Sequence, residues 1–249
     1  MQVQEPDAYE IINKDNVQPV ILTCEHASTY IPQKYHNLGL APEMLDTHIA
    51  RDKGCGELTR KLAERSGCTA FLANYSRLFI DYNRRENEAD LILAESDKVA
   101  VPANVCLSEA EREYRLENYH RPYYRAIFAA IERLRQNGRK PIIFSIHGFT
   151  PQLKGGAPRP WHAGVLYVKE NPFAEALLKH LQQYPNFKVD ANVPYDLRQF
   201  NTGSAAICGT DTGLENAVIE IRDSEFDDIT AGVDHWCAVL NRFLQDYRV

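Results

Sequence analysis

The sequence predicts an α/β fold with a mostly parallel central sheet. Three short apolar runs, at residues 19–23, 141–146 and 217–221, have the length of strands that are buried on both faces. Segments with a helical period of about 3.6 residues lie between them. Strands that alternate with helices are typical of βαβ units, and no linker or repeat interrupts them, so we expect one domain over residues 1–249.

The other elements follow from periodicity and from helix breakers. A helix is expected over residues 42–67, where apolar residues recur on one face and Gly67 provides a stop. Ser108 and Glu111 form a capping box that opens a helical segment running to Gly138, with a kink or restart at Pro122. We further expect strands at 69–73, 164–168 and 187–191, helices at 172–183 and 229–247, and loops at 25–40, 74–90, 154–161 and 196–212, the last with room for a short helix.

The composition is that of a soluble globular protein: 44% of the residues are hydrophobic, 25% are charged, and the formal net charge is −6. No basic stripe with interleaved aromatic residues is present, so we expect no nucleic-acid partner. No apolar stretch approaches the roughly 18 to 20 residues of a membrane span. Residues 1–7 lack the basic and apolar regions of a signal peptide, which predicts a cytoplasmic protein. The sequence specifies no oligomeric state.

The six cysteines form no Cys-x-x-Cys pair, so we expect mostly buried, reduced thiols. Cys24 differs from the others because it precedes Glu25 and His26. A thiol nucleophile at Cys24 is therefore an alternative. It is disfavoured because adjacent residues of a strand point to opposite faces, whereas a nucleophile needs its base beside it.

Two histidines suggest a metal site. His26 and His147 each follow an apolar strand, and the carboxyl ends of strands in open α/β sheets are where ligands bind. Each is followed by a small residue, Ala27 or Gly148, that leaves room for an ion. Two histidines with a carboxylate are typical of catalytic zinc, although the same ligands also suit iron, cobalt or manganese.

Two acidic residues are candidates for the third ligand. Asp52 lies near the start of the helix expected after the first loop, from where its carboxylate can reach the sheet edge. Glu25 adjoins His26 and would either point away from the metal or orient one of its ligands.

Glu220 is the candidate general base. It lies within an apolar strand, where an ionised carboxylate is costly unless it is paired or close to a metal. A glutamate beside a metal can take a proton from water and pass it to a leaving nitrogen. The alternative is a structural pair with Arg222, two residues along the same strand face.

A third polar cluster lies in residues 76–84, which contain Arg77, Asp81, Asn83 and Arg84. Arginine binds a carboxylate through two hydrogen bonds, and asparagine adds a further donor, so the cluster suits an anionic substrate. A solvated loop is the alternative, against which the apolar run at 78–80 argues.

Taken together, these segments resemble the N-formylglutamate amidohydrolase family, which is related to zinc carboxypeptidase- and aspartoacylase-like hydrolases. The resemblance rests on residues 23–28, 52–54, 76–84, 145–149, 192–195 and 219–222, which occur in the family's order. It implies a three-layer αβα sandwich of the phosphorylase/hydrolase-like type with a mostly parallel, mixed sheet. The ligand order of zinc-dependent cell-wall amidases is also similar and implies zinc on His26, Asp52 and His147.

The resemblance also implies the reaction. Its substrate would be a small anionic N-acyl amino acid, chiefly N-formyl-L-glutamate, which is hydrolysed to formate and glutamate. Glu220 would be the general base, and Arg77, Asn83, Arg84 and Arg222 would hold carboxylates. Residues 208–213 lack a histidine found in many members. A zinc deacylase or peptidase for another acyl or peptide-like substrate, and a non-catalytic binding member of the family, are the alternatives.

Overall fold

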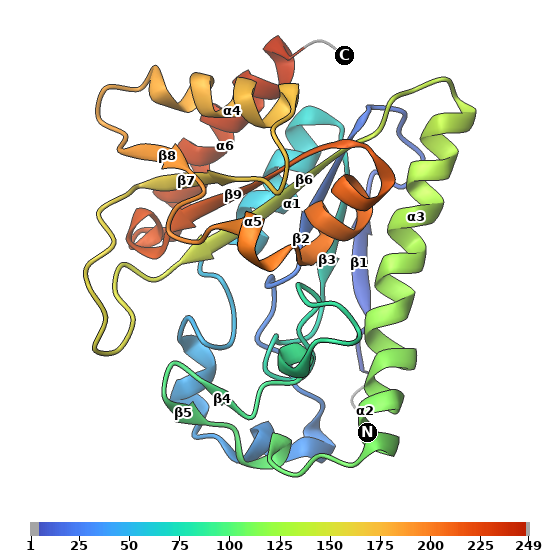
Figure 1. The fold of residues 1–249 in the computed structure, drawn as a ribbon, viewed down its shortest axis with the longest axis vertical. Coiled ribbons are helices and arrows are strands. Elements are labelled where there is room, and N and C mark those ends of the chain that lie inside the picture. The colour runs from blue at the N-terminus through green and yellow to red at the C-terminus, as the bar shows by residue number, and fades with distance from the viewer. Residues whose placement is uncertain (1–4, 248–249) are drawn as a thin grey trace.

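A mixed sheet lies at the centre of the computed structural model, which describes residues 5–247 (Figure 1). The N-terminal stretch that argues against a signal peptide lies partly outside these residues. Within residues 5–247 the sheet has seven strands, in the order β1-β3-β2-β6-β9-β7-β8, and a two-stranded hairpin lies apart from it. The sheet strands are β1 (Tyr9–Ile12), β2 (Val20–Cys24), β3 (Thr69–Ala73), β6 (Ile142–Phe149), β7 (Ala163–Leu166), β8 (Val189–Ala191) and β9 (Glu215–Arg222), and the hairpin strands are β4 (Glu95–Ser96) and β5 (Val99–Ala100).

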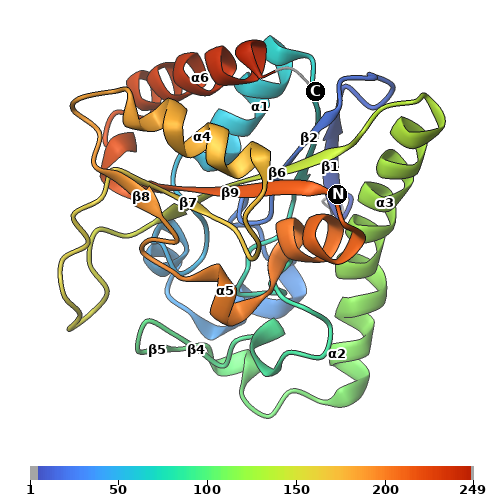
Figure 2. The same cartoon turned by 45° about the horizontal axis from the view of Figure 1, so that its top comes forward.

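Helices cover both faces of the sheet, which confirms the three-layer αβα sandwich (Figures 1 and 2). One face carries α1 (Cys55–Ser66), α4 (Pro172–Gln182) and α6 (Ile229–Asp246), which pack on one another and on the sheet. The other face carries α3 (Arg121–Gln136), preceded by α2 (Glu109–Arg115), and the short α5 (Leu197–Phe200). No helix in the described part of the chain is long and apolar enough to span a bilayer.

The strand order creates a crevice for ligands. Strands β3, β2, β6 and β9 are mutually parallel, whereas β1 and β7 run antiparallel to β3 and β9. The chain leaves β2 through α1 to reach β3 on one side, and β6 lies on the other side. Because the strand order reverses there, the connections after β2 and β6 diverge, and a crevice opens between the strand ends.

Strand alternation decides which face each polar side chain takes. Ile142, Phe144 and Ile146 of β6 pack in the core beneath α1, α4 and α6, whereas Ile143 packs in the core beneath α3. With a period of two, His147 shares the face of Ile143. The polar residues of the sheet edge therefore gather on the α3 side.

The sequence did not predict β1 or the β4–β5 hairpin, and two elements near the site differ from the prediction. The helix expected over 42–67 is wrong in its first part: Pro42–Asp46 forms a 3₁₀ turn and α1 begins only at Cys55. Between them the Asp52 amide donates to the His26 carbonyl at 3.0 Å and Gly54 adopts φ 75°, so a tertiary contact overrides the apolar periodicity. Strand β6 continues to Phe149, so His147 lies within the strand rather than beyond its end.

Candidate active site

Three buried side chains converge where β2 and β6 lie side by side. His26 Nδ1 lies 3.2 Å from Asp52 Oδ2, His147 Nδ1 lies 3.0 Å from the same oxygen, and the two Nδ1 atoms are 3.2 Å apart. In a tetrahedral zinc site with bonds near 2.0 Å, neighbouring donors are about 3.3 Å apart. The Gly148 amide also donates to Asp52 Oδ2, at 3.0 Å, and fixes the carboxylate. The three residues therefore fit a divalent metal.

The outer nitrogen of each imidazole meets a buried carboxylate. His26 Nε2 donates to Asp81 Oδ1 at 2.8 Å, and His147 Nε2 donates to Glu25 Oε2 at 2.7 Å. Such bonds select the tautomer whose Nδ1 carries a lone pair and raise the basicity of that nitrogen toward a metal. Glu25 thus lies behind His147, where the Tyr123 hydroxyl donates to its other oxygen at 3.1 Å. The structure brings Asp52, and not Glu25, into the set of three donors.

The charges of this cluster are mutually balanced. Burial alone would raise the pKa of Asp52, but the adjacent imidazoles lower it well below its ordinary value. Asp81 behaves alike: burial opposes ionisation, whereas His26, Arg77 and Arg84 together hold its pKa well below the usual range. Both carboxylates are therefore ionised at neutral pH, as a metal ligand and its supporting group must be.

Glu220 lies on β9, beside its register partner His147 on the neighbouring strand β6. Its side chain is buried, and within the described residues its Oε2 has no hydrogen-bond partner. Burial, reinforced by Asp52 and Asp223, raises the pKa of Glu220 to about 8 against the opposing effect of His147. The structure does not form the structural pair with Arg222, because the Arg222 guanidinium donates to Glu225 Oε1 at 2.9 Å.

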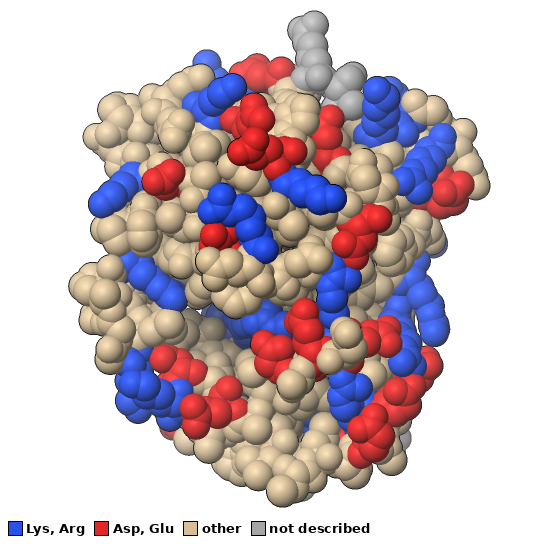
Figure 3. Space-filling view, in the orientation of Figure 1, with Lys and Arg blue, Asp and Glu red and all other residues tan. Residues whose placement is uncertain are grey.

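A cavity of about 280 Å³ connects these groups. In Figure 3 the face is hollowed near its middle, with basic side chains in the hollow and acidic ones at its rim. Of the residues predicted to hold carboxylates, the structure brings Arg77, Asn83 and Arg84 to the cavity but not Arg222. The lining residues are His26, Asp52, Arg77, Asn83, Arg84, His147, Gly148, Leu166, Tyr195, Leu197, Phe200, Thr202, Val218 and Glu220.

The sequence did not predict the roles of two residues at the site, Asp81 and Tyr195. Asp81 stood out only as part of a charged cluster, and its role behind His26 depends on how the segment after β3 folds back. Tyr195 belongs to residues 192–195, which resemble the family, but no function could be assigned to it from the sequence. In the structure it lines the cavity, and its hydroxyl accepts a hydrogen bond from Arg159 at 3.0 Å. Cys24 packs in the core on the opposite face, and burial raises its pKa well above the ordinary value, so it does not suit nucleophilic catalysis.

Asp81 gives a prediction about metal affinity. Asp81→Asn keeps the side chain's shape but removes the charge that supports His26, so we expect a 10- to 100-fold weaker metal affinity. Competition with a chromophoric chelator measures the change. Asp15→Asn, at a side chain that is 91% exposed, is the matched control. Equal affinities in the two variants would show that Asp81 does not support the ligand.

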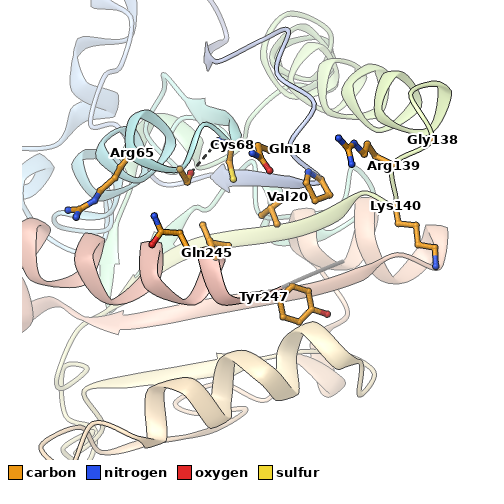
Figure 4. A pocket seen from close by; sticks show the side chains of 12 residues that line it. Gln18, Val20, Arg65, Cys68, Gly138, Arg139, Lys140, Gln245 and Tyr247 are labelled. Carbon is orange, nitrogen blue, oxygen red and sulfur yellow. Dashed lines mark hydrogen bonds between the residues drawn. The ribbon is translucent and has the colours of Figure 1, made fainter.

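A larger hollow, about 730 Å³, lies at the opposite end of the strands, beside the start of β2 (Figure 4). Arg65, Arg139 and Lys140 border it, and its described lining contains no histidine or carboxylate. Cys68 is the single cysteine in this described lining, so the hollow offers neither a set of metal ligands nor a carboxylate or imidazole base. The smaller cavity, which holds both, is the candidate active site.

Comparison with known proteins identifies the family. The sequence profile of the N-formylglutamate amidohydrolase family matches residues 18–226. A gene product of Agrobacterium tumefaciens with a crystal structure is 29% identical, covers 96% of this chain and 94% of its own, and superposes with a TM-score of 0.89. An N-formylglutamate amidohydrolase from Ralstonia eutropha shares the fold, with 20% identity, 95% coverage of both chains and a TM-score of 0.71. A search of the curated proteins finds no match. Since the matched segment spans most of the sequence, the chain belongs to the N-formylglutamate amidohydrolase family.

Proposed function

We propose that this chain hydrolyses the amide bond of an N-acyl amino acid in a metal-dependent reaction, with N-formyl-L-glutamate, cleaved to formate and glutamate, as the first substrate to test. The observation that carries this proposal is the set of three donor atoms, 3.0 to 3.2 Å apart, with an unpaired glutamate oxygen beside the same cavity. A buried carboxylate without a partner is costly, and such groups are concentrated at functional sites.

His26, Asp52 and His147 would hold the metal through the two Nδ1 atoms and one carboxylate oxygen. Their nitrogen and oxygen donors suit zinc and also other divalent transition metals. Such an ion, when bound, polarises the scissile carbonyl and makes water a stronger acid. Glu25 and Asp81 would keep the two imidazoles in the tautomer and orientation that this requires.

Glu220 would move the protons. Its Oε2 would accept a proton from the attacking water and then deliver it to the nitrogen of the departing amine. Without a metal the pKa of Glu220 is about 8, and the positive charge of a bound metal would lower it toward neutrality, where a carboxyl group accepts and returns a proton at similar cost. The buried position of this group would also keep competing water away from the proton in transit.

Arg77, Asn83 and Arg84 would hold the substrate's carboxylates. Arg84 lines the cavity and donates through Nε to Asp90 at 2.7 Å, which orients its remaining N–H groups. The Arg77 guanidinium lies 3.3 Å from Asp81 and 3.6 Å from Asp52, so its positive charge would be close to the metal-binding residues. Arg222 is left out of the proposed binding set, because its guanidinium donates to Glu225 and it is not among the residues that line the cavity.

Metal analysis combined with hydrolysis of N-formyl-L-glutamate tests the proposal. We expect about one zinc per chain, and we expect formate release that a chelator abolishes and added zinc restores. Stoichiometric metal with tight ligand binding but no cleavage of any N-acyl amino acid would instead indicate a non-catalytic binding member. Undiminished hydrolysis after complete removal of the metal would contradict metal dependence.

A further inference from the structure

One wall of the cavity is apolar, and hydrolysis of a formyl group makes no use of it. Leu166 at the end of β7, Val218 on β9 and Leu197 on α5 pack in one cluster and line the cavity together. Phe200, at the end of α5, lines the same cavity with 59% of its surface exposed. An apolar ligand would cover both the cluster's cavity face and this exposed ring.

The strand order separates Leu166 and Val218 from the basic side chains, whereas Phe200 lies near them, since the carbonyl of the adjacent Asn201 accepts a hydrogen bond from Arg85. Arg77 and Arg84 follow β3, His26 follows β2, and His147 lies on β6. Glu220 lies on β9 and Leu166 on β7. From β3 to β7, the order of groups across the sheet is therefore cationic, metal-binding, general base and apolar, with Leu166 and Val218 paired two residues before Glu220 along β9.

An N-acyl amino acid has the same polarity. Its carboxylates lie on the nitrogen side of the scissile amide, and its acyl group lies on the carbonyl side. With the carboxylates on the arginines and the amide between the metal ligands and Glu220, the acyl group points to Leu166, Leu197 and Val218. A formyl group carries only hydrogen beyond its carbonyl carbon, so the substrate would make no apolar contact with the cavity face of these side chains.

We propose that Leu166, Leu197 and Val218 form an acyl-group site, and that the preferred substrate carries a saturated apolar acyl chain of several carbons in place of formyl. This assignment rests on the proposed hydrolysis of N-acyl amino acids. The bond that breaks is the same amide C–N bond, and water supplies the hydroxyl group of the carboxylic acid that is released with the free amino acid.

The test is a series of substrates that differ only in the acyl group: N-formyl-, N-acetyl-, N-butyryl- and N-hexanoyl-L-glutamate. Released glutamate is the common product, so one assay on the zinc-loaded protein measures every member. We expect kcat/KM to rise from formyl to butyryl by about fourfold for each added methylene, the value of burying that group. A kcat/KM for N-formyl-L-glutamate that equals or exceeds that for the butyryl compound would overturn the assignment.

Val218→Thr ties the effect to the wall. Threonine has nearly the volume of valine but places a hydroxyl among apolar side chains. We expect the ratio of kcat/KM for the butyryl and formyl substrates to fall about tenfold. Val105→Thr, at a residue that is 53% exposed, is the matched control and should leave this ratio unchanged. An unchanged ratio in Val218→Thr would also overturn the assignment. Because the ratio compares two substrates in the same protein sample, a smaller fraction of folded protein does not change it.

A second series separates the acyl site from a side-chain site. If N-formyl-L-leucine is cleaved faster than N-formyl-L-glutamate while acyl length has no effect, the wall binds the amino-acid side chain and the acyl assignment is wrong. Release from no member of either series would refute the proposed hydrolysis itself, and the acyl assignment would fall with it.

Discussion

Glu220→Gln is expected to lower kcat for N-acyl amino acid hydrolysis by about a thousandfold while the metal content stays the same. Glutamine keeps the size of the side chain but cannot accept a proton from water. The three donor atoms on His26, Asp52 and His147 are untouched by the change. Steady-state kinetics on protein of known zinc content measures the loss.

Glu215→Gln is the matched control, since Glu215 begins the same strand and bonds Tyr247 away from the cavity. Its kcat should stay within about twofold of the parent. A Glu220→Gln variant with near-normal kcat would rule out Glu220 as the base, and a variant that had lost its zinc would show a role in metal binding instead.

The same variant has a second signature in protein stripped of metal. Burial raises the pKa of Glu220 to about 8, above the roughly 4.3 of an unfolded chain, so the folded state holds this proton more tightly. The stabilisation is present in full below about pH 4 and is lost as pH rises to about 8. Glutamine does not ionise, so Glu220→Gln should gain stability relative to the parent over this range. Urea unfolding at several pH values measures the difference, and a pH-independent difference would contradict the raised pKa.

His147→Ala is expected to weaken zinc binding by more than a hundredfold. It removes one of three donor atoms, which should cost more than the 10- to 100-fold typical of a residue that only supports a ligand. Chelator competition measures the affinity, with His235→Ala on the exposed side of α6 as the matched control.

The His147→Ala change also leaves Glu25 buried without its 2.7 Å partner and so lowers stability. Asp52→Asn, which disturbs packing less, is therefore measured beside it and should lose affinity as well. Folded variants of both kinds that retain one tightly bound zinc would refute the assigned ligands.

The amino-acid sequence by itself determined the parts of this protein that depend on local pattern. Apolar runs of strand length with polar residues at their ends predicted the sheet and the edge at which His26 and His147 meet. This was possible because a strand buried on both faces requires consecutive apolar residues, which the sequence shows directly. It also predicted that carboxylates would join them. Residues 42–54 were misassigned as helix because apolar periodicity is only a local preference, and the hydrogen bond of Asp52 to His26 outweighs it.

Only the tertiary structure decided how these parts are paired. The sequence left both Asp52 and Glu25 as candidates for the third ligand. In the structure, Asp52 lies beside the Nδ1 atoms of His26 and His147, whereas Glu25 accepts a hydrogen bond from Nε2 on the other side of the His147 ring. The tertiary structure likewise places Asp81 within hydrogen-bond distance of His26 and Arg222 within hydrogen-bond distance of Glu225. The physical reason is common to all four. A buried charge is stabilised by the partner that lies within about 3 Å of it. That partner belongs to a distant segment or to a turn, and the local sequence pattern does not predict where such a segment lies.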